Sequence, residues 1–181
     1  MKKFWPEDIE LKCLICIMLL EKTAAEYFSL LSDNIEDGSF SLVFKYIAQG
    51  SQNHYMILKK ILESCGENVN EEKISLKDCY RYIGGEGINI INRYNEIISL
   101  IKSGHKISKK ELYYLIKDEI DIDRISGIDI FTSIMYEIYR NIVYDEELIM
   151  IFNLLMIDEK NHINILKEIL ENLKFSLKEN Y

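Results

Sequence analysis

The longest regular pattern near the start of the chain is a stripe of apolar side chains at helical spacing. These side chains recur every three or four residues from Ile9 to Leu31, which is the period of an amphipathic helix. Pro6, the only proline of the chain, suits the first turn of such a helix. The pattern predicts a helix over residues 7–32 and, after a short turn, a second helix over 39–65.

The second of these helices recurs later in the chain. Residues 53–63 align with residues 161–171 at an offset of 108, and eight of the eleven aligned pairs are identical. The same offset matches Phe44 with Phe152. Because polar and apolar positions agree together, this pattern predicts two copies of one helical hairpin.

The second copy predicts two further helices, over 126–144 and 146–173, joined by a tight turn. Short joints make consecutive helices antiparallel neighbours. The expected fold is therefore one all-α domain of 181 residues: a ferritin-like four-helix bundle that pairs hairpin one (7–65) with hairpin two (126–173). A helical crossover insert at 67–125 connects the two hairpins.

The insert contains turn signals and two amphipathic segments. The glycine-rich residues 84–87 predict a hinge or loop. Residues 88–103 are expected to form one helix and residues 108–121 another. Ser108 and Glu111 have the spacing of a capping box at the start of the second helix.

Composition narrows the class of protein. Apolar residues make up 48% and charged residues 29%, as in ordinary globular proteins, and the formal net charge is −8. An acidic chain is unsuited to nucleic acids or anionic membranes, so neither is expected as a partner. The apolar run 13–20 ends at Glu21 and Lys22, well short of a membrane span, and no export signal is recognisable.

The four cysteines are interpreted as reduced thiols of a cytoplasmic protein, because no export signal accompanies them. Cys13 and Cys16 form a Cys-x-x-Cys pair within the first helix. Their place in the apolar stripe favours small core residues over a redox or metal site.

Five ionisable side chains fall where core residues are expected. Burial of an isolated carboxylate is unfavourable by several kcal/mol, so such a group must be paired or must bind a cation. Each of the four bundle helices supplies at least one of these groups, which favours a metal site between the helices. The candidate ligands are Glu21, His54, Asp129, Glu159 and His162.

The spacing Glu159-Lys160-Asn161-His162 places a carboxylate and an imidazole on one face of a helix. Together with Glu21 and His54, this Glu-x-x-His unit resembles the rubrerythrin branch of the ferritin-like superfamily. The resemblance covers about residues 11–65 and 127–173. It implies a di-iron or di-manganese carboxylate centre in which Glu159 bridges the two metals and each histidine completes one of them.

The chain departs from the family pattern at three points. Asp129 stands where the family has glutamate, and Ser51 stands where the family has the glutamate that bridges the metals. No pair of Cys-x-x-Cys motifs follows the last helix, so the rubredoxin domain of full rubrerythrins is missing. A single metal or a relic site is therefore an alternative to a di-iron centre.

The resemblance implies an oxidoreductase that acts on peroxide or dioxygen, or that oxidises ferrous iron, with iron or manganese as cofactor. The alternative function is a degenerate helical module that acts by protein–protein interaction, and iron handling without turnover is a third. A small-molecule oxidant and a homodimer are the expected partners. The structural alternative to metal binding is a buried ion pair or a solvated face at Glu159 and His162. For Asp129, the alternative is a residue of the helix N-terminal turn that interacts with the helix dipole.

Overall fold

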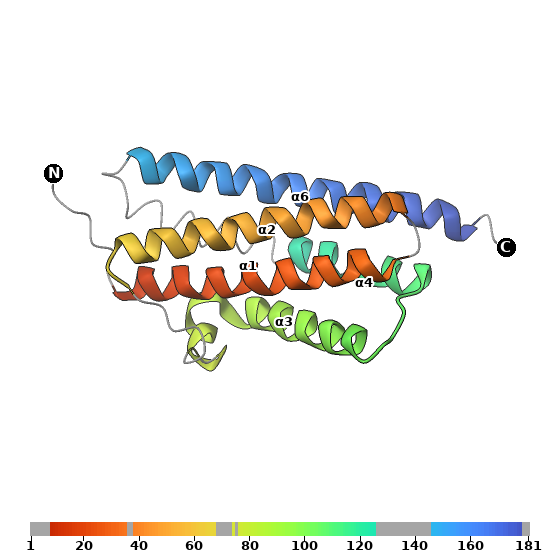
Figure 1. The fold of residues 1–181 in the computed structure, drawn as a ribbon, viewed down its shortest axis with the longest axis horizontal. Helices are drawn as coiled ribbons and strands as arrows, with labels where there is room; N and C mark the ends of the chain where they lie inside the picture. The colour runs from red at the N-terminus through yellow and green to blue at the C-terminus, as the bar shows by residue number, and fades with distance from the viewer. Residues whose placement is uncertain (1–7, 36–37, 68–73, 75, 126–145, 179–181) are drawn as a thin grey trace.

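The computed structural model describes residues 8–35, 38–67, 74, 76–125 and 146–178 (Figure 1). These residues form helices and contain no strand, which confirms the all-α prediction. The helices are α1 (Asp8–Asn34), α2 (Gly38–Ser64), α3 (Leu76–Lys102), α4 (Lys109–Ile125) and α6 (Glu146–Lys178).

Helices α1 and α2 lie side by side along their length (Figure 1). Their bounds agree with the predicted helices at 7–32 and 39–65 to within two residues. The apolar stripe of α1 faces inward, so that Leu14, Ile17 and Leu31 are fully buried. Burial of this stripe is the main source of stability for helices of this kind.

Helix α6 runs beside α2 (Figure 1) and confirms the predicted last helix, which it extends to Lys178. Phe152 on α6 and Phe44 on α2, which the repeat pairs, are both fully buried. The predicted third bundle helix at 126–144, with Asp129, lies outside the described residues. The four-helix bundle built from two hairpins therefore stays a prediction.

The insert is helical, as expected, and it packs on both predicted hairpins. Helix α3 lies against α1, and α4 lies against α6. Tyr94 of α3 stacks on Tyr27 of α1 with ring centroids 4.3 Å apart. The hydroxyl of Tyr94 donates a hydrogen bond to Glu119 of α4. This bond links the two insert helices α3 and α4.

The glycine-rich segment bends a helix instead of ending one. Gly84 has φ 68° and ψ 178°, a conformation that side chains other than glycine rarely adopt, and α3 continues on both sides of it. The helix thus begins at Leu76, well before the predicted start at residue 88. The predicted hinge is correct, but it lies inside α3.

The predicted capping box at the start of α4 is confirmed. The backbone N–H of Ser108 donates to Glu111 Oε2 over 2.8 Å, and the backbone N–H of Glu111 donates to Ser108 Oγ over 3.2 Å. These bonds satisfy backbone donors that a helix leaves unpaired at its first turn. The Ser108 hydroxyl, which donates to Glu111 Oε2 over 2.6 Å, and the Ser108 backbone N–H lower the pKa of Glu111 to about 2, with a further contribution from His105.

The prediction of four reduced thiols is wrong. Cys16 of α1 and Cys79 of α3 form a disulfide with a Cα–Cα distance of 5.5 Å, and both are buried. The sequence conceals this pairing because 63 residues separate the cysteines and only the packing of α3 on α1 brings them together. Cys13 and Cys65 are half-buried and take no part in a disulfide. The cysteines therefore give no support to a cytoplasmic location.

Among the helices that the structure describes, none has the combination of length and apolar character needed to cross a bilayer.

Candidate metal centre

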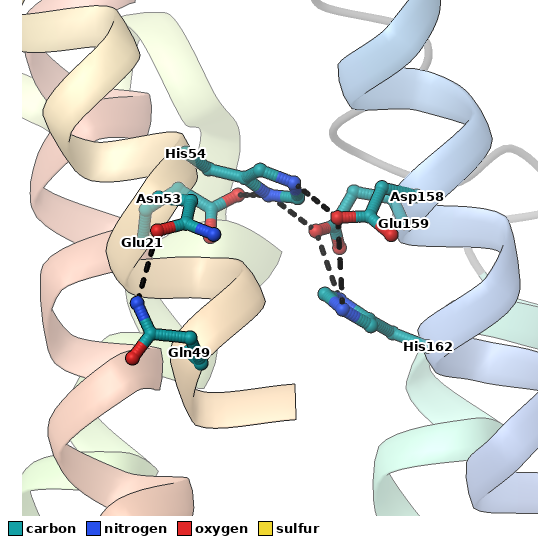
Figure 2. A network of polar contacts seen from close by, with 7 residues as sticks. All are labelled: Glu21, Gln49, Asn53, His54, Asp158, Glu159 and His162. Atoms are coloured by element: carbon teal, nitrogen blue, oxygen red, sulfur yellow. Dashed lines mark hydrogen bonds and ion pairs between the residues drawn. The ribbon is translucent and has the colours of Figure 1, made fainter. Parts of the chain in front are cut away.

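His54 lies at the middle of a buried polar cluster between α2, α1 and α6 (Figure 2). Its Nδ1 is 2.8 Å from Glu159 Oε1 on α6 and 3.5 Å from Glu21 Oε1 on α1. Its Nε2 is 2.9 Å from Asp158 Oδ2. One imidazole thus contacts three carboxylates that belong to two other helices.

His162 approaches the same cluster from α6 (Figure 2). Its Nδ1 is 3.3 Å from Glu159 Oε1, and its ring centroid is 5.7 Å from that of His54. Glu159 Oε1 consequently faces the Nδ1 atoms of both histidines. The Nε2 edge of His162 lies toward Asp158, whose Oδ2 is 4.0 Å away.

Helical periodicity explains why these side chains meet. Glu21 lies on the buried stripe of α1 between Ile17 and Ala24, and His54 lies on the buried face of α2. Glu159 and His162 are three positions apart on α6, so they project from the same side of that helix. The side chains of Glu21, His54 and His162 are at most 5% exposed.

The electrostatics of the cluster reflect burial and mutual contact. Burial raises the pKa of Glu21 to about 7, and the neighbouring Glu159 carboxylate adds to this. Burial also opposes the charge of Glu159, but the imidazoles of His162 and His54 outweigh it and hold its pKa low. Burial lowers the pKa of His54, yet Glu159 and Glu21 more than offset this and raise it to about 10.

The side chains present fit a divalent transition metal. Glu21, His54 and Glu159 each offer one ligand atom, and these atoms lie within 4.8 Å of one another. The buried Oε1 of Glu159 makes no well-directed hydrogen bond to any described residue, although two imidazoles face it. Imidazole nitrogen and carboxylate oxygen together suit iron, manganese or zinc. An ion among these atoms would give this oxygen a well-directed partner in addition to its ion-pair contacts with the two imidazoles.

Asp158 is a member of the cluster that the sequence did not reveal. It lies next to Glu159, and its side chain is 36% exposed, so it resembles an ordinary surface residue. Its Oδ2 nevertheless contacts His54 Nε2. In the neutral imidazole that a metal requires, a carboxylate at this nitrogen keeps the proton on Nε2 and leaves Nδ1, which points at Glu159 and Glu21, available as a ligand. In the sequence, its position four residues before His162, on the same helical face, could have indicated that Asp158 belongs to the cluster.

Ser51 is buried where the family pattern has a glutamate, with 3% of its surface exposed. A hydrogen bond between Ser51 and Glu21 offsets a small part of the rise in the pKa of the Glu21 carboxyl group. Ser51 thus contacts the cluster but brings no charge to it. No described glutamine replaces the missing ligand, because Gln49 and Gln52 are exposed and Gln49 bonds to Asn53.

The structure therefore brings together four of the five predicted ligands: Glu21, His54, Glu159 and His162. The fifth, Asp129, lies outside the described residues. Comparisons with protein-family models, with curated proteins and with solved structures each gave no match.

Proposed function

We propose that this chain is a metalloprotein that binds a divalent transition metal, iron or manganese, through Glu21, His54, Glu159 and His162. The observation that carries the proposal is the buried Glu21–His54–Glu159 cluster, whose ligand atoms come from three helices and lie within 4.8 Å of one another. Buried carboxylates without a cation are unfavourable, and a metal ion offsets this cost.

Charge favours one ion over two. The two glutamates among the proposed ligands supply two negative charges, which balance one divalent cation, whereas Asp158 pairs with His54 Nε2. Ser51 supplies no third charge. We therefore propose a single tightly bound metal as the main form of the centre, and a second metal would need Asp129 or an anion from solvent.

We further propose that the activity is of the rubrerythrin type: reduction of peroxide or dioxygen, or oxidation of ferrous iron. When bound, the metal would supply redox chemistry toward a small oxidant, with electrons from a reductant outside the chain. The side chains of the protein would orient the ligands, balance the charge of the metal and limit the access of water. Asp158 orients His54, the carboxylates hold the positive charge, and the packed helices exclude bulk water.

Metal analysis tests the proposal. Protein expressed in iron- or manganese-rich medium is expected to retain about one metal ion per chain. The Glu159→Gln variant is expected to lose it, whereas Glu168→Gln, which changes an exposed glutamate of the same helix, is expected to retain it. Peroxide consumption by the ferrous-loaded protein, measured against the same two variants, then tests the activity. A metal-free wild-type protein that takes up no added Fe²⁺ or Mn²⁺ contradicts the proposal.

A non-catalytic helical module is the second candidate, and the buried Ser51 favours it, since the bridging carboxylate of the family is missing. Ser51→Glu separates the two functions. If the unmodified protein binds no metal and the Ser51→Glu variant binds one tightly, the result favours a non-catalytic module that has lost its metal chemistry. Tight binding by the unmodified chain would favour the first candidate.

A further inference from the structure

Gly50 lies in the interior of α2, where glycine is the least favourable residue after proline. Its backbone is helical: positive φ angles occur at Gly66, Gly84 and Gly104 but not at Gly50, so any residue could adopt this conformation. No turn or cap explains the glycine. The reason must lie in the side chain that Gly50 does not have.

The space beside Gly50 is filled by His162. A Cβ atom at position 50 would lie 2.4 Å from Nε2 and 2.5 Å from Cε1 of the His162 ring. Cβ atoms do not approach other heavy atoms this closely, because contacts below 3.0 Å are strongly repulsive. The imidazole edge therefore packs directly on the backbone of α2.

The His162 ring has little room to retreat. It is 4% exposed. Its Nδ1 faces Glu159 Oε1 at 3.3 Å, and the Tyr46 ring lies edge-on to it with centroids 6.1 Å apart. A methyl group at position 50 would thus push the imidazole away from Glu159 and His54.

The internal repeat sharpens this observation. The offset of 108 pairs Gly50 with Asp158, and each lies four residues before its own histidine. Asp158 contacts His54 on the opposite helix (Figure 2). Gly50 lies against His162 on the opposite helix. Equivalent positions thus affect the two histidines differently. Asp158 offers a carboxylate to His54, and Gly50 has no side chain, so that the His162 ring fits beside it.

We infer that Gly50 is a positioning residue, and that its missing side chain lets the His162 imidazole reach the metal centre beside Glu159. This inference rests on the proposed function, because it concerns the geometry of the same centre. Gly50 contacts no metal. It acts through His162 alone, so its effect should vanish when that imidazole is removed.

A double-mutant cycle of Gly50→Ala and His162→Ala tests the inference, with Co²⁺ as the metal probe. Co²⁺ accepts nitrogen and oxygen ligands, and its visible spectrum reports their number and geometry. Gly50→Ala alone is expected to weaken Co²⁺ binding about tenfold or more and to alter the spectrum. In the H162A background it is expected to change neither. Gly38→Ala, on the same helix with open space at its Cβ, is the control and is expected to have no effect.

Unfolding of the metal-free proteins gives a second measurement. Gly50→Ala is expected to lower the unfolding midpoint when His162 is present and to raise it in the H162A background, because alanine favours a helix once the clash is gone. Wild-type affinity in the G50A variant, or the same loss in both backgrounds, overturns the inference and leaves the proposed function intact. Failure of the wild-type protein to bind Co²⁺, Fe²⁺ or Mn²⁺ instead contradicts the proposed function, and the unfolding measurement still decides whether Gly50 and His162 are coupled.

Discussion

His54 and His162 occupy equivalent positions in the repeat, yet their surroundings differ. His54 has carboxylates at both ring nitrogens, with Asp158 at Nε2 and Glu159 at Nδ1. His162 has Glu159 at Nδ1, but its Nε2 edge lies on the Gly50 backbone and makes no hydrogen bond to a described residue. The repeat thus preserves the imidazole, while the residues around each imidazole diverge.

Because of this difference, we expect the two histidines to contribute unequally to metal binding. The pKa of His54 is raised to about 10, despite the opposing effect of burial, because Glu159 and Glu21 stabilise its charged form. The same carboxylates would surround a cation held by its Nδ1. His162 has fewer anchoring contacts, so its place depends more on close packing. We expect His54 to be the stronger ligand.

The largest effect is expected at Glu159, whose Oε1 faces the Nδ1 atoms of both histidines. Glu159→Gln removes a carboxylate charge that both Nδ1 atoms share, and metal affinity should fall on the order of 100-fold or more. Titration calorimetry with Mn²⁺ measures this, with the exposed Glu168→Gln as the matched control. An affinity close to that of the wild type would mean that the two histidines do not share a centre.

A comparison of His54→Ala with His162→Ala tests the inequality directly. Both should weaken metal binding, but the loss at His54 should exceed the loss at His162 by about tenfold, since His54 is anchored by a second carboxylate. The same Mn²⁺ titration provides the ratio. Equal losses would show that the differing surroundings have no energetic consequence.

The next effect concerns mainly His54, because Asp158 Oδ2 is 2.9 Å from His54 Nε2 but 4.0 Å from His162 Nε2. Asp158→Asn keeps the shape of the side chain but removes its charge, which should lower metal affinity by about tenfold through His54. In NMR spectra of the metal-free protein, the imidazole resonances of His54 should shift more than those of His162. A larger shift at His162 would contradict the assignment of Asp158 to His54.

The smallest effect is expected far from both histidines and serves as a reference. Glu111→Gln should leave metal affinity unchanged and lower the thermal midpoint slightly, because it weakens the cap of α4. Ser108 and His105 lower the pKa of Glu111 from 4.5 to about 2, so its stabilising effect is complete above pH 4.5 and is lost as the pH falls toward 2. The difference between variant and wild type should disappear over that range. A difference that persists at the acid end would place its cause elsewhere.

Much of the local structure followed from the sequence. The helical periods predicted α1, α2 and α6, and the spacing of Ser108 and Glu111 predicted the start of α4. Glu21 and His54 could be identified as candidate ligands because a charged group on an apolar stripe must find a partner when the stripe is buried. Such rules act within one helix or over a short range, so they need no knowledge of packing.

The partners of these residues could be found only in the tertiary structure. Asp158 looks like a surface residue, Gly50 looks like a weak point of a helix, and Cys16 looks like a core residue in isolation. Their contacts with His54, His162 and Cys79 depend on how two helices are aligned along each other. That alignment is determined by the sum of many apolar contacts across the interface, and no short sequence pattern records it.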